Sequence, residues 1–504
     1  AIVNDNVAIA NQQSYGVNGE IVPDLSKAKV IVCVDADPLG ADKLSLYHTV
    51  RFAQSRTPSK DNPTMSKLFV AEAQYSLTGA NADERVRLHP SQIEAFLGIL
   101  SGGSSAGATT ETTAAAQRAS AALKAAGAEG VVVAGRHLSP RAQMMAASIN
   151  KASGSAAVSA SNVVPNSHEK WSAIATLQED MLAGNVHVLI TADVNPEYSA
   201  SREFKAALAK VKNRAAINLH EDETARQCGI SIPAAHWLES WGDAVTMDGT
   251  LSLQQPLIAP LNDGIPSVQD TLIALVNKVS AGFLGETATY ADYVKSRWTG
   301  SKADWTLALQ NGVVASVGAQ PLTGTVAAQS NSTSTTQSNG TGAAQTNATT
   351  TAQTNGAGSM ASAAIPSGMV LMTVPAHHLY DGRQANNGWL QELPDGVTKI
   401  TWDNVALISP KTAVDLGLAP GLGAKEIIKA NEQIITVTTA HGGIDLPVYV
   451  QVGMADNVIV TQLGYGRTQG GKVLQGVGSN AFNVAAPGHA VQYVAAKIEK
   501  LSRI

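Results

Sequence analysis

Apolar runs recur along the first half of the chain, and each ends in a polar turn. Residues 30–34 read Val-Ile-Val-Cys-Val and precede a turn that contains Asp35, Asp37 and Pro38. A second run, residues 186–192, is closed by Asn195 and Pro196. An apolar run without polar alternation is typical of a parallel strand that is buried on both faces.

Two further apolar runs follow stretches with helical character. Residues 130–135 follow the stretch 119–126, and residues 215–219 follow the stretch 203–212. Strands that alternate with helices predict an α/β fold with open parallel sheets and helices on both faces. Such sheets bind ligands beyond the carboxyl ends of their strands. The turns after residues 34 and 192 are therefore candidate binding sites.

The pattern changes twice further along the chain. Residues 322–364 carry no charged or aromatic side chain, so they bury too little apolar surface to offset the entropy of ordering. After them, short strands with glycine turns predict a small β-barrel. The predicted segments are residues 1–100, an N-terminally incomplete first α/β domain; 101–130, a surface excursion and helix; 131–321, a second α/β domain; 322–364, a disordered linker; and 365–504, the barrel.

Composition narrows the possible functions. The net charge of the 504 residues is −5 and no lysine or arginine cluster is present, which argues against a nucleic-acid partner. No run of 18 apolar residues exists, so no direct membrane span is predicted. Cys33 and Cys228 are too few for an iron–sulfur cluster, which takes about four thiolates, and Cys33 is predicted to be a buried core thiol. The opening at Ala1, without an initiator methionine, predicts a processed or partial chain.

Candidate metal ligands have simpler interpretations. Residues 220–223 read His-Glu-Asp-Glu, but adjacent side chains do not share one face, and a capping turn is favoured. His236 and the pair His377-His378 have no partner at ligand spacing. No Ser/His/Asp or Cys/His arrangement is legible. The sequence predicts neither a catalytic residue nor a metal ligand.

Residues 221–260 carry the most specific motif. An acidic turn from Glu221 to Thr224 leads to a strand that ends in Ile-Pro, a tryptophan-rich segment around Glu239 and a Gln-Gln-Pro tail. This order resembles the signature that lines the pterin cofactor cleft of the large molybdopterin oxidoreductases. Residues 408–418 are similar to the opening of their C-terminal barrel. The resemblance implies molybdopterin-oxidoreductase-like parallel sheets and a small β-barrel of the molybdopterin-dinucleotide-binding type.

Two further blocks, residues 69–96 and 380–404, narrow the match. They resemble the molybdopterin-like N-terminal half of the B subunit of bacterial alternative complex III, a membrane-bound quinol oxidase. The resemblance implies a non-catalytic scaffold that supports electron transfer from membrane quinol to periplasmic carriers. It implies no cofactor in this chain, and iron–sulfur clusters and haem c in partners. Those partners are an iron–sulfur module on the same or a separate polypeptide, multi-haem cytochrome c subunits and integral membrane quinol-binding subunits, with this chain peripheral on the periplasmic face of the inner membrane.

Within that resemblance, the two turns are the remains of a cofactor cleft, and residues 380–388 are the next place to look for one. The candidate lining residues are Asp35, Asp37, Pro38, Asn195, Pro196, Glu221, Thr224 and Glu239. Asn195-Pro196 keeps the turn of the molybdoenzymes, whereas two carboxylates at the first turn would repel a diphosphate. Whether the chain has its own active site stays open. The alternatives are an active molybdenum oxidoreductase large subunit of the polysulfide or thiosulfate reductase type, and a free-standing ligand-binding protein.

Overall fold

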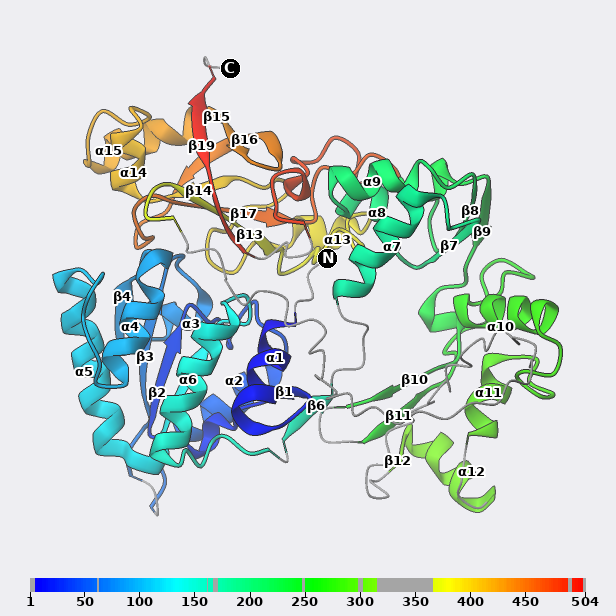
Figure 1. The fold of residues 1–504 in the computed structure, drawn as a ribbon, viewed down its shortest axis with the longest axis horizontal. Coiled ribbons are helices and arrows are strands. Elements are labelled where there is room, and N and C mark those ends of the chain that lie inside the picture. The colour runs from blue at the N-terminus through cyan, green and yellow to red at the C-terminus, as the bar shows by residue number, and fades with distance from the viewer. Residues whose placement is uncertain are drawn as a thin grey trace, which may run out of the picture.

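The computed structural model describes residues 5–60, 63–160, 162–165, 171–246, 250–297, 302–314, 366–487 and 492–501. Parallel sheets with helices form the first half of the chain and a curled sheet forms the C-terminal part (Figure 1). The predicted linker at 322–364 lies outside the described residues. Among the described helices, none has the length and hydropathy that a bilayer crossing requires.

The first sheet has four parallel strands in the order β4-β3-β2-β5. Its strands are β2 (Val30–Val34), β3 (Lys67–Glu72), β4 (Glu84–Arg87) and β5 (Gly130–Ala134). The associated helices are α1 (Asn6–Tyr15), α2 (Ser45–Ser55), α3 (Leu77–Ala80), α4 (Ile93–Leu100), α5 (Thr110–Ala126) and α6 (Pro140–Ser153).

Both faces of this sheet are covered, as the unbroken apolar run predicts. Val32 and Phe69 pack in one cluster with residues of α4, α5 and α6. Ile31 and Cys33 lie in a second cluster with Phe52 of α2, and Cys33 is fully buried, as predicted.

Two details of the predicted organisation are wrong. β5 pairs with β2, so the boundary at residue 131 divides the first sheet instead of following it. The linear order of strands does not reveal which sheet a strand joins, because a crossover can return to either side of an existing strand. The segment 101–130 is less of a surface excursion than predicted, since α5 begins at Thr110 and buries Ala116 and Ala119 against the sheet.

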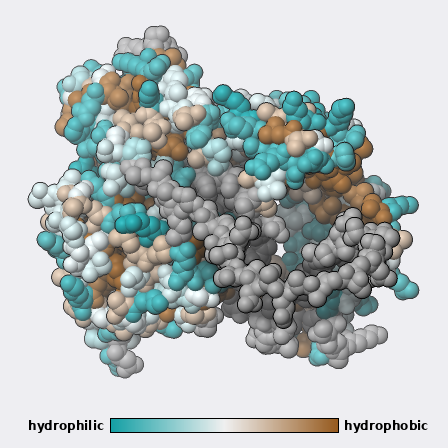
Figure 2. All heavy atoms as spheres, viewed as in Figure 1, coloured by the Kyte–Doolittle hydropathy of each residue, from teal (hydrophilic) through white to brown (hydrophobic). Residues whose placement is uncertain are grey.

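The second sheet is parallel and has three strands, β7 (Val188–Ala192), β8 (Asn213–Asn218) and β9 (Ile230–Pro233). Leu189 packs against a cluster formed by α7 (Trp171–Ala183) and α9 (Arg202–Leu208). On the opposite face, Val188 and Ile190 are 60% and 44% exposed, so the prediction of a strand buried on both faces is wrong for β7. Figure 2 shows hydrophobic side chains gathered on this side of the molecule, near β7–β9 and α10 (Val268–Val279).

Two small antiparallel sheets complete the part of the chain that precedes residue 315. One pairs β1 (Gly19–Ile21) with β6 (Val163–Pro165). The other joins β10 (Gly242–Val245), β11 (Leu251–Gln254) and β12 (Val313–Val314), beside α11 (Tyr290–Ser296) and α12 (Lys302–Asn311). Short helices are α8 (Pro196–Ser199), α13 (Gly388–Glu392), α14 (Pro410–Asp415) and α15 (Ala424–Ile427), and 3-10 turns occur at Leu25–Lys27, Pro90–Gln92, Gly127–Glu129, Ala225–Gln227, Trp237–Glu239, Ile428–Glu432 and Ala481–Asn483.

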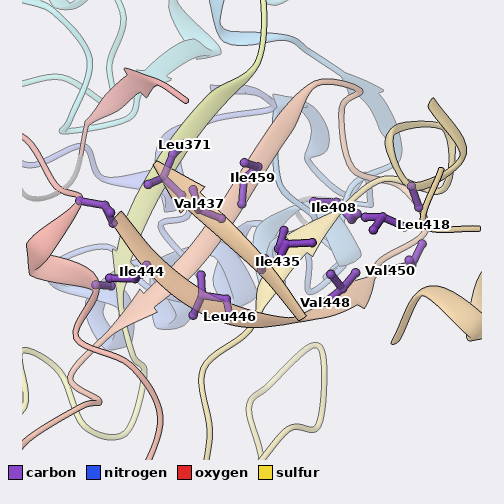
Figure 3. Close-up of a cluster of buried hydrophobic side chains, with 14 of the residues drawn as sticks. Leu371, Ile408, Leu418, Ile435, Val437, Ile444, Leu446, Val448, Val450 and Ile459 are labelled. Atoms are coloured by element: carbon purple, nitrogen blue, oxygen red, sulfur yellow. The ribbon is translucent and has the colours of Figure 1, made fainter. Parts of the chain in front are cut away.

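The C-terminal sheet has seven strands in the order β18-β13-β17-β14-β16-β15-β19. They are β13 (Val370–Pro375), β14 (Ala406–Ile408), β15 (Ile434–Thr439), β16 (Gly442–Val450), β17 (Val458–Leu463), β18 (Tyr493–Ala495) and β19 (Lys497–Lys500). Only Ala496 separates the two edge strands, β18 and β19, so both ends of the strand order meet in one stretch of chain. The sheet therefore curls around an apolar core of aliphatic side chains (Figure 3).

The curled sheet contacts both α/β units at the carboxyl ends of their strands. At the first sheet, Ala455 N–H donates to the carbonyl of Ala73 at 2.8 Å, and Arg85 Nη1 donates to that of Gly453 at 2.8 Å. At the second sheet, Tyr198 Oη donates to the carbonyl of Tyr465 at 2.7 Å. Both candidate turns therefore lie where the curled sheet meets the rest of the molecule.

Candidate functional site

The first turn begins with Asp35, whose backbone is left-handed (φ 50°). Its side chain is buried, and Oδ1 accepts a hydrogen bond from Ala73 N–H at 3.1 Å. Oδ2 accepts one from Tyr493 Oη at 2.8 Å and lies 2.8 Å from His137 Nε2. Asp35 therefore links β2 to β18 of the curled sheet, and its carboxylate oxygens both have protein partners.

Asp37 fills the concavity of the same turn. Its Oδ1 accepts hydrogen bonds from Thr78 N–H at 2.9 Å and Thr78 Oγ1 at 2.7 Å. Its Oδ2 accepts one from Ala41 N–H at 2.8 Å and occupies the space that a Cβ at Gly40 would need. Asp42 Oδ2 accepts the Asp37 N–H at 2.7 Å.

The backbone amides of the turn are all engaged. Leu39 N–H donates to Thr78 Oγ1 at 3.0 Å, and the N–H groups of Gly40 and Asp42 donate to the Asp37 carbonyl. Pro38 has no N–H to offer. A phosphate is held by free amides at such a strand–helix turn, and here every amide from 37 to 42 that can donate has an acceptor inside the protein.

Several carboxylates are crowded at the first turn and at the adjacent end of β3. Burial and the neighbouring Asp37 raise the pKa of Asp42 to about 6. Burial raises the pKa of Glu72 to about 7, although Arg85 opposes this rise. Burial and the nearby carboxylates also raise the pKa of the Cys33 thiol well above its ordinary value. The amides and the charge of this turn do not fit the diphosphate of a pterin nucleotide.

The second turn repeats the backbone of the first. Asp193 follows β7 with φ 51°, close to that of Asp35. Asn195 Oδ1 accepts hydrogen bonds from the Oγ1 and N–H of Thr224, at 2.7 and 3.2 Å, and Thr224 Oγ1 in turn accepts the Glu197 N–H at 3.0 Å. Two predicted candidates, Asn195 and Thr224, thus join the loops that follow β7 and β8.

Glu223 occupies an anion-binding position that the sequence did not identify. Its carboxylate accepts hydrogen bonds from Arg467 Nε at 3.0 Å, from Thr468 N–H at 2.7 Å and from Gln469 N–H at 3.1 Å. Burial opposes its charge, but these hydrogen bonds outweigh burial and lower the pKa of Glu223 to about 2. The sequence shows a glutamate inside the acidic turn and an arginine after a glycine-rich stretch. Nothing in the sequence indicates that these two side chains form an ion pair.

Beside the second turn lies a cavity of about 1300 Å³. It is bounded by the loops after β7, β8 and β9 and by residues 381–389. Of the predicted candidates, Asn195, Pro196 and Glu239 line it, whereas Asp35, Asp37, Pro38, Glu221 and Thr224 do not. The two turns therefore do not open into one cleft.

The remaining candidates have structural partners. The Glu239 carboxylate accepts the N–H groups of His236 and Leu261, at 2.9 and 3.1 Å. Glu221 is exposed and forms an ion pair with Arg226 at 3.2 Å. Within the described ranges, no group of three or more His, Cys, Asp or Glu residues is arranged to hold a metal ion.

Comparisons with known proteins agree with this architecture. No family model matches the chain. The chain is 27% identical over 343 residues to the menaquinone reductase, molybdopterin-binding-like subunit of Nitratidesulfovibrio vulgaris. The aligned region covers 58% of this chain and 48% of the relative. The chain thus spans about half the length of that relative.

A solved structure matches a larger share of the chain than this relative does. Acetylene hydratase from Pelobacter acetylenicus superposes with a TM-score of 0.61 over 98% of this chain and 81% of that one, at 12% sequence identity. At that identity the likeness concerns the fold alone. Taken with the order of sheets and the curled C-terminal sheet, it shows that the chain has a molybdopterin-oxidoreductase-like fold.

Proposed function

We propose that this chain is a non-catalytic scaffold subunit of a quinone-linked electron-transfer complex. The link to quinones is supported by the relative from N. vulgaris, whose name places it in a menaquinone reductase as a molybdopterin-binding-like subunit. The observation that carries the non-catalytic part is the first turn. Each of its N–H groups donates to an acceptor inside the protein, either a carboxylate or carbonyl of the turn itself or the hydroxyl of Thr78.

Glu223 supports the same interpretation at the second turn. The guanidinium of Arg467 and the two backbone amides that follow it form an anion-binding position, and the carboxylate of Glu223 occupies it. Releasing it would separate a partly buried ion pair, which costs several kcal/mol (about 3 to 5). In this proposal internal carboxylates take the places of cofactor phosphates, and the retained fold serves for assembly.

More specifically, we propose that the chain is the molybdopterin-like N-terminal half of the B subunit of alternative complex III. It rests on the resemblance of residues 69–96 and 380–404. In that arrangement the chain packs against an iron–sulfur module, multi-haem cytochrome c subunits and integral membrane quinol-binding subunits on the periplasmic face. Electrons pass through the clusters and haems of those partners.

One observation favours the alternative of an active molybdenum oxidoreductase large subunit. The cavity of about 1300 Å³ lies at the carboxyl ends of the second sheet and exceeds the usual size of a small-molecule pocket. A cofactor that entered it would have to bind without the first turn.

Purification from native membranes through a tag on this chain distinguishes the scaffold function from the alternative. For a scaffold, we expect haem-bearing and iron-rich subunits to copurify, without stoichiometric molybdenum or tungsten. Recovery of the chain without any such subunit would contradict the scaffold. Release of a fluorescent oxidised pterin from the denatured complex would favour the alternative.

A further inference from the structure

The free edge of β7, the side of this strand that faces away from β8, lines the cavity beside the second turn. β7 ends the strand order β7-β8-β9. Asp193 N–H donates to the carbonyl of Ile217 on β8 at 2.9 Å, and successive residues of a parallel strand bond to opposite sides. The backbone groups of Ile190 and Ala192 therefore point to the free edge, where they have no hydrogen-bond partner among the described residues. Both residues line the cavity.

The first sheet shows what fills the equivalent position. Asp35 and Asp193 follow β2 and β7 with nearly the same left-handed φ, so Val34 corresponds to Ala192. β2 is paired on both edges, with β3 on one side and β5 on the other. The carbonyl of Val34 accepts the N–H of Gly135, after β5, at 2.9 Å. Within the described part of the chain, the second sheet lacks the strand that β5 supplies to the first.

The walls beside the free edge are apolar. Leu177 of α7 and Phe204 of α9 line the cavity on the side where the helices cover the sheet. On the other side, the side chain of Ile190 is exposed. In the first sheet, Val131 and Val132 of β5 pack into clusters on opposite faces. A strand added to β7 would therefore bury aliphatic side chains on both of its faces.

The end of this edge also carries an unpaired charge. In the first sheet, His137 follows β5 and its Nε2 lies 2.8 Å from Asp35 Oδ2. The equivalent Asp193 is exposed and lines the cavity, and its carboxylate has no hydrogen bond or ion pair among the described residues. The nearby Arg383 is paired with a neighbouring carboxylate at 2.7 Å. Asp193 therefore favours a basic residue just beyond the added strand.

The chain itself is a poor source of such a strand. Residues 315–365 are the one stretch outside the described ranges that is long enough for a strand and the turn after it. They contain no lysine, arginine or histidine, so they offer no partner to Asp193. The charge at the strand end thus points to another polypeptide.

We propose that the free edge of β7 accepts an extended segment of a partner subunit, which adds a parallel strand of aliphatic residues followed by a basic residue. In strand addition, main-chain hydrogen bonds give affinity and the contacts of alternate side chains give specificity. The opposite edge of the sheet is protected, because β9 ends in Pro233, which has no N–H to offer. The inference rests on the proposed scaffold function, for which it names a contact.

Fluorescence anisotropy of the purified full chain tests the edge with a labelled peptide. The peptide Gly-Val-Val-Val-Ala-Gly-Arg-His copies residues 130–137. We expect saturable binding, and about tenfold weaker binding when proline replaces the valine that corresponds to Val133, because that N–H faces β7 in the added strand. Absence of saturable binding, or equal binding of the proline peptide, would overturn the proposal. Neither result depends on the metal content that tests the scaffold function.

Two protein variants locate the binding. Ile190→Pro removes an N–H that faces away from β8, which an edge strand tolerates, and the Kd for the peptide should rise about tenfold. Ser231→Pro is the matched control, since Ser231 N–H faces the free edge of β9, and it should leave the Kd unchanged. Asp193→Asn keeps the backbone and should raise the Kd about threefold for the full peptide, but not for a peptide without its last two residues. Wild-type affinity in both Ile190→Pro and Asp193→Asn would contradict the proposal.

Photo-crosslinking identifies the natural occupant. A benzophenone side chain in place of the exposed Val188, beside the free edge, is activated in the complex isolated through the tagged chain. We expect crosslinks to one segment of a different subunit. Crosslinks to residues 315–365 or to a second copy of this chain, or no crosslink at all, would contradict the assignment.

Discussion

At each of the two turns, a single carboxylate of the protein accepts the available hydrogen bonds. Asp37 accepts hydrogen bonds from Thr78 and Ala41, and Glu223 accepts them from Arg467, Thr468 and Gln469. In each case a side chain of the protein supplies a negative charge to backbone amides that a phosphate could otherwise accept from. The stability of the fold therefore depends on the ionisation of these groups.

Neutralising Glu223 should destabilise the protein in a pH-dependent way. Its pKa is about 2 in the folded state, against an ordinary 4.5, so its contribution is complete above about pH 4.5 and is lost as the pH falls toward 2. We expect Glu223→Gln to lower the free energy of unfolding by about 2 kcal/mol at neutral pH. Urea unfolding followed by tryptophan fluorescence measures this loss. Glu221→Gln, at an exposed neighbour, is the control, and an equal loss in both variants would contradict the assignment.

Asp42 should have the opposite effect. Its folded-state pKa of about 6 exceeds its ordinary 3.8, so the folded protein binds an extra proton between these values and loses stability as the pH rises through them. Because the side chain is partly exposed, we expect Asp42→Asn to be more stable than the wild type by only about 1 kcal/mol near pH 8. The advantage should vanish below about pH 4. Thermal melting across this range checks the prediction, and parallel curves for the two proteins would refute it.

At the scale of elements, the apolar pattern predicted the first sheet well and the second sheet less well. The runs in β2 and β7 look alike, but Ile31 is fully buried and Ile190 is 44% exposed. The difference depends on which helices reach each face, and that is a property of tertiary structure. Likewise, Arg467 and Glu223 are 244 positions apart, and nothing local links them. Asn195 and Thr224 could be predicted as candidates because their motifs are local, whereas the cavity is formed by distant segments that only the fold brings together.

Gly40 tests whether Asp37 fills the first turn. A Cβ at this position would overlap Asp37 Oδ2, so Gly40→Ala should destabilise the protein by about 1 to 3 kcal/mol through overpacking. The loss should shrink when Asp37→Ala is introduced first, because the conflicting carboxylate is then gone. Gly368→Ala, where a Cβ meets nothing within 4 Å, is the control. Additive losses in the double variant, measured by chemical denaturation, would show that Asp37 is not the obstacle.

At the scale of the whole molecule, the curled sheet is held to the first sheet by a few polar contacts. Tyr493 Oη donates to Asp35 Oδ2 at 2.8 Å, and burial with the nearby Asp35 raises the pKa of this phenol well above its ordinary value. Tyr493→Phe should cost about 1 to 3 kcal/mol, since it removes a hydrogen bond to a buried carboxylate. Hydrogen exchange should show faster opening of β18 and β13. Tyr449→Phe, on β16 of the same sheet, is the control and should not change this exchange. Unchanged exchange in Tyr493→Phe would mean that apolar packing alone docks the sheet.

We infer that the molybdopterin-type architecture of this chain serves assembly and carries no cofactor of its own. Elemental analysis of the intact complex, normalised to the amount of this chain, tests it most directly. We predict abundant iron from the partner subunits and only trace molybdenum and tungsten. About one molybdenum or tungsten atom per chain would contradict it.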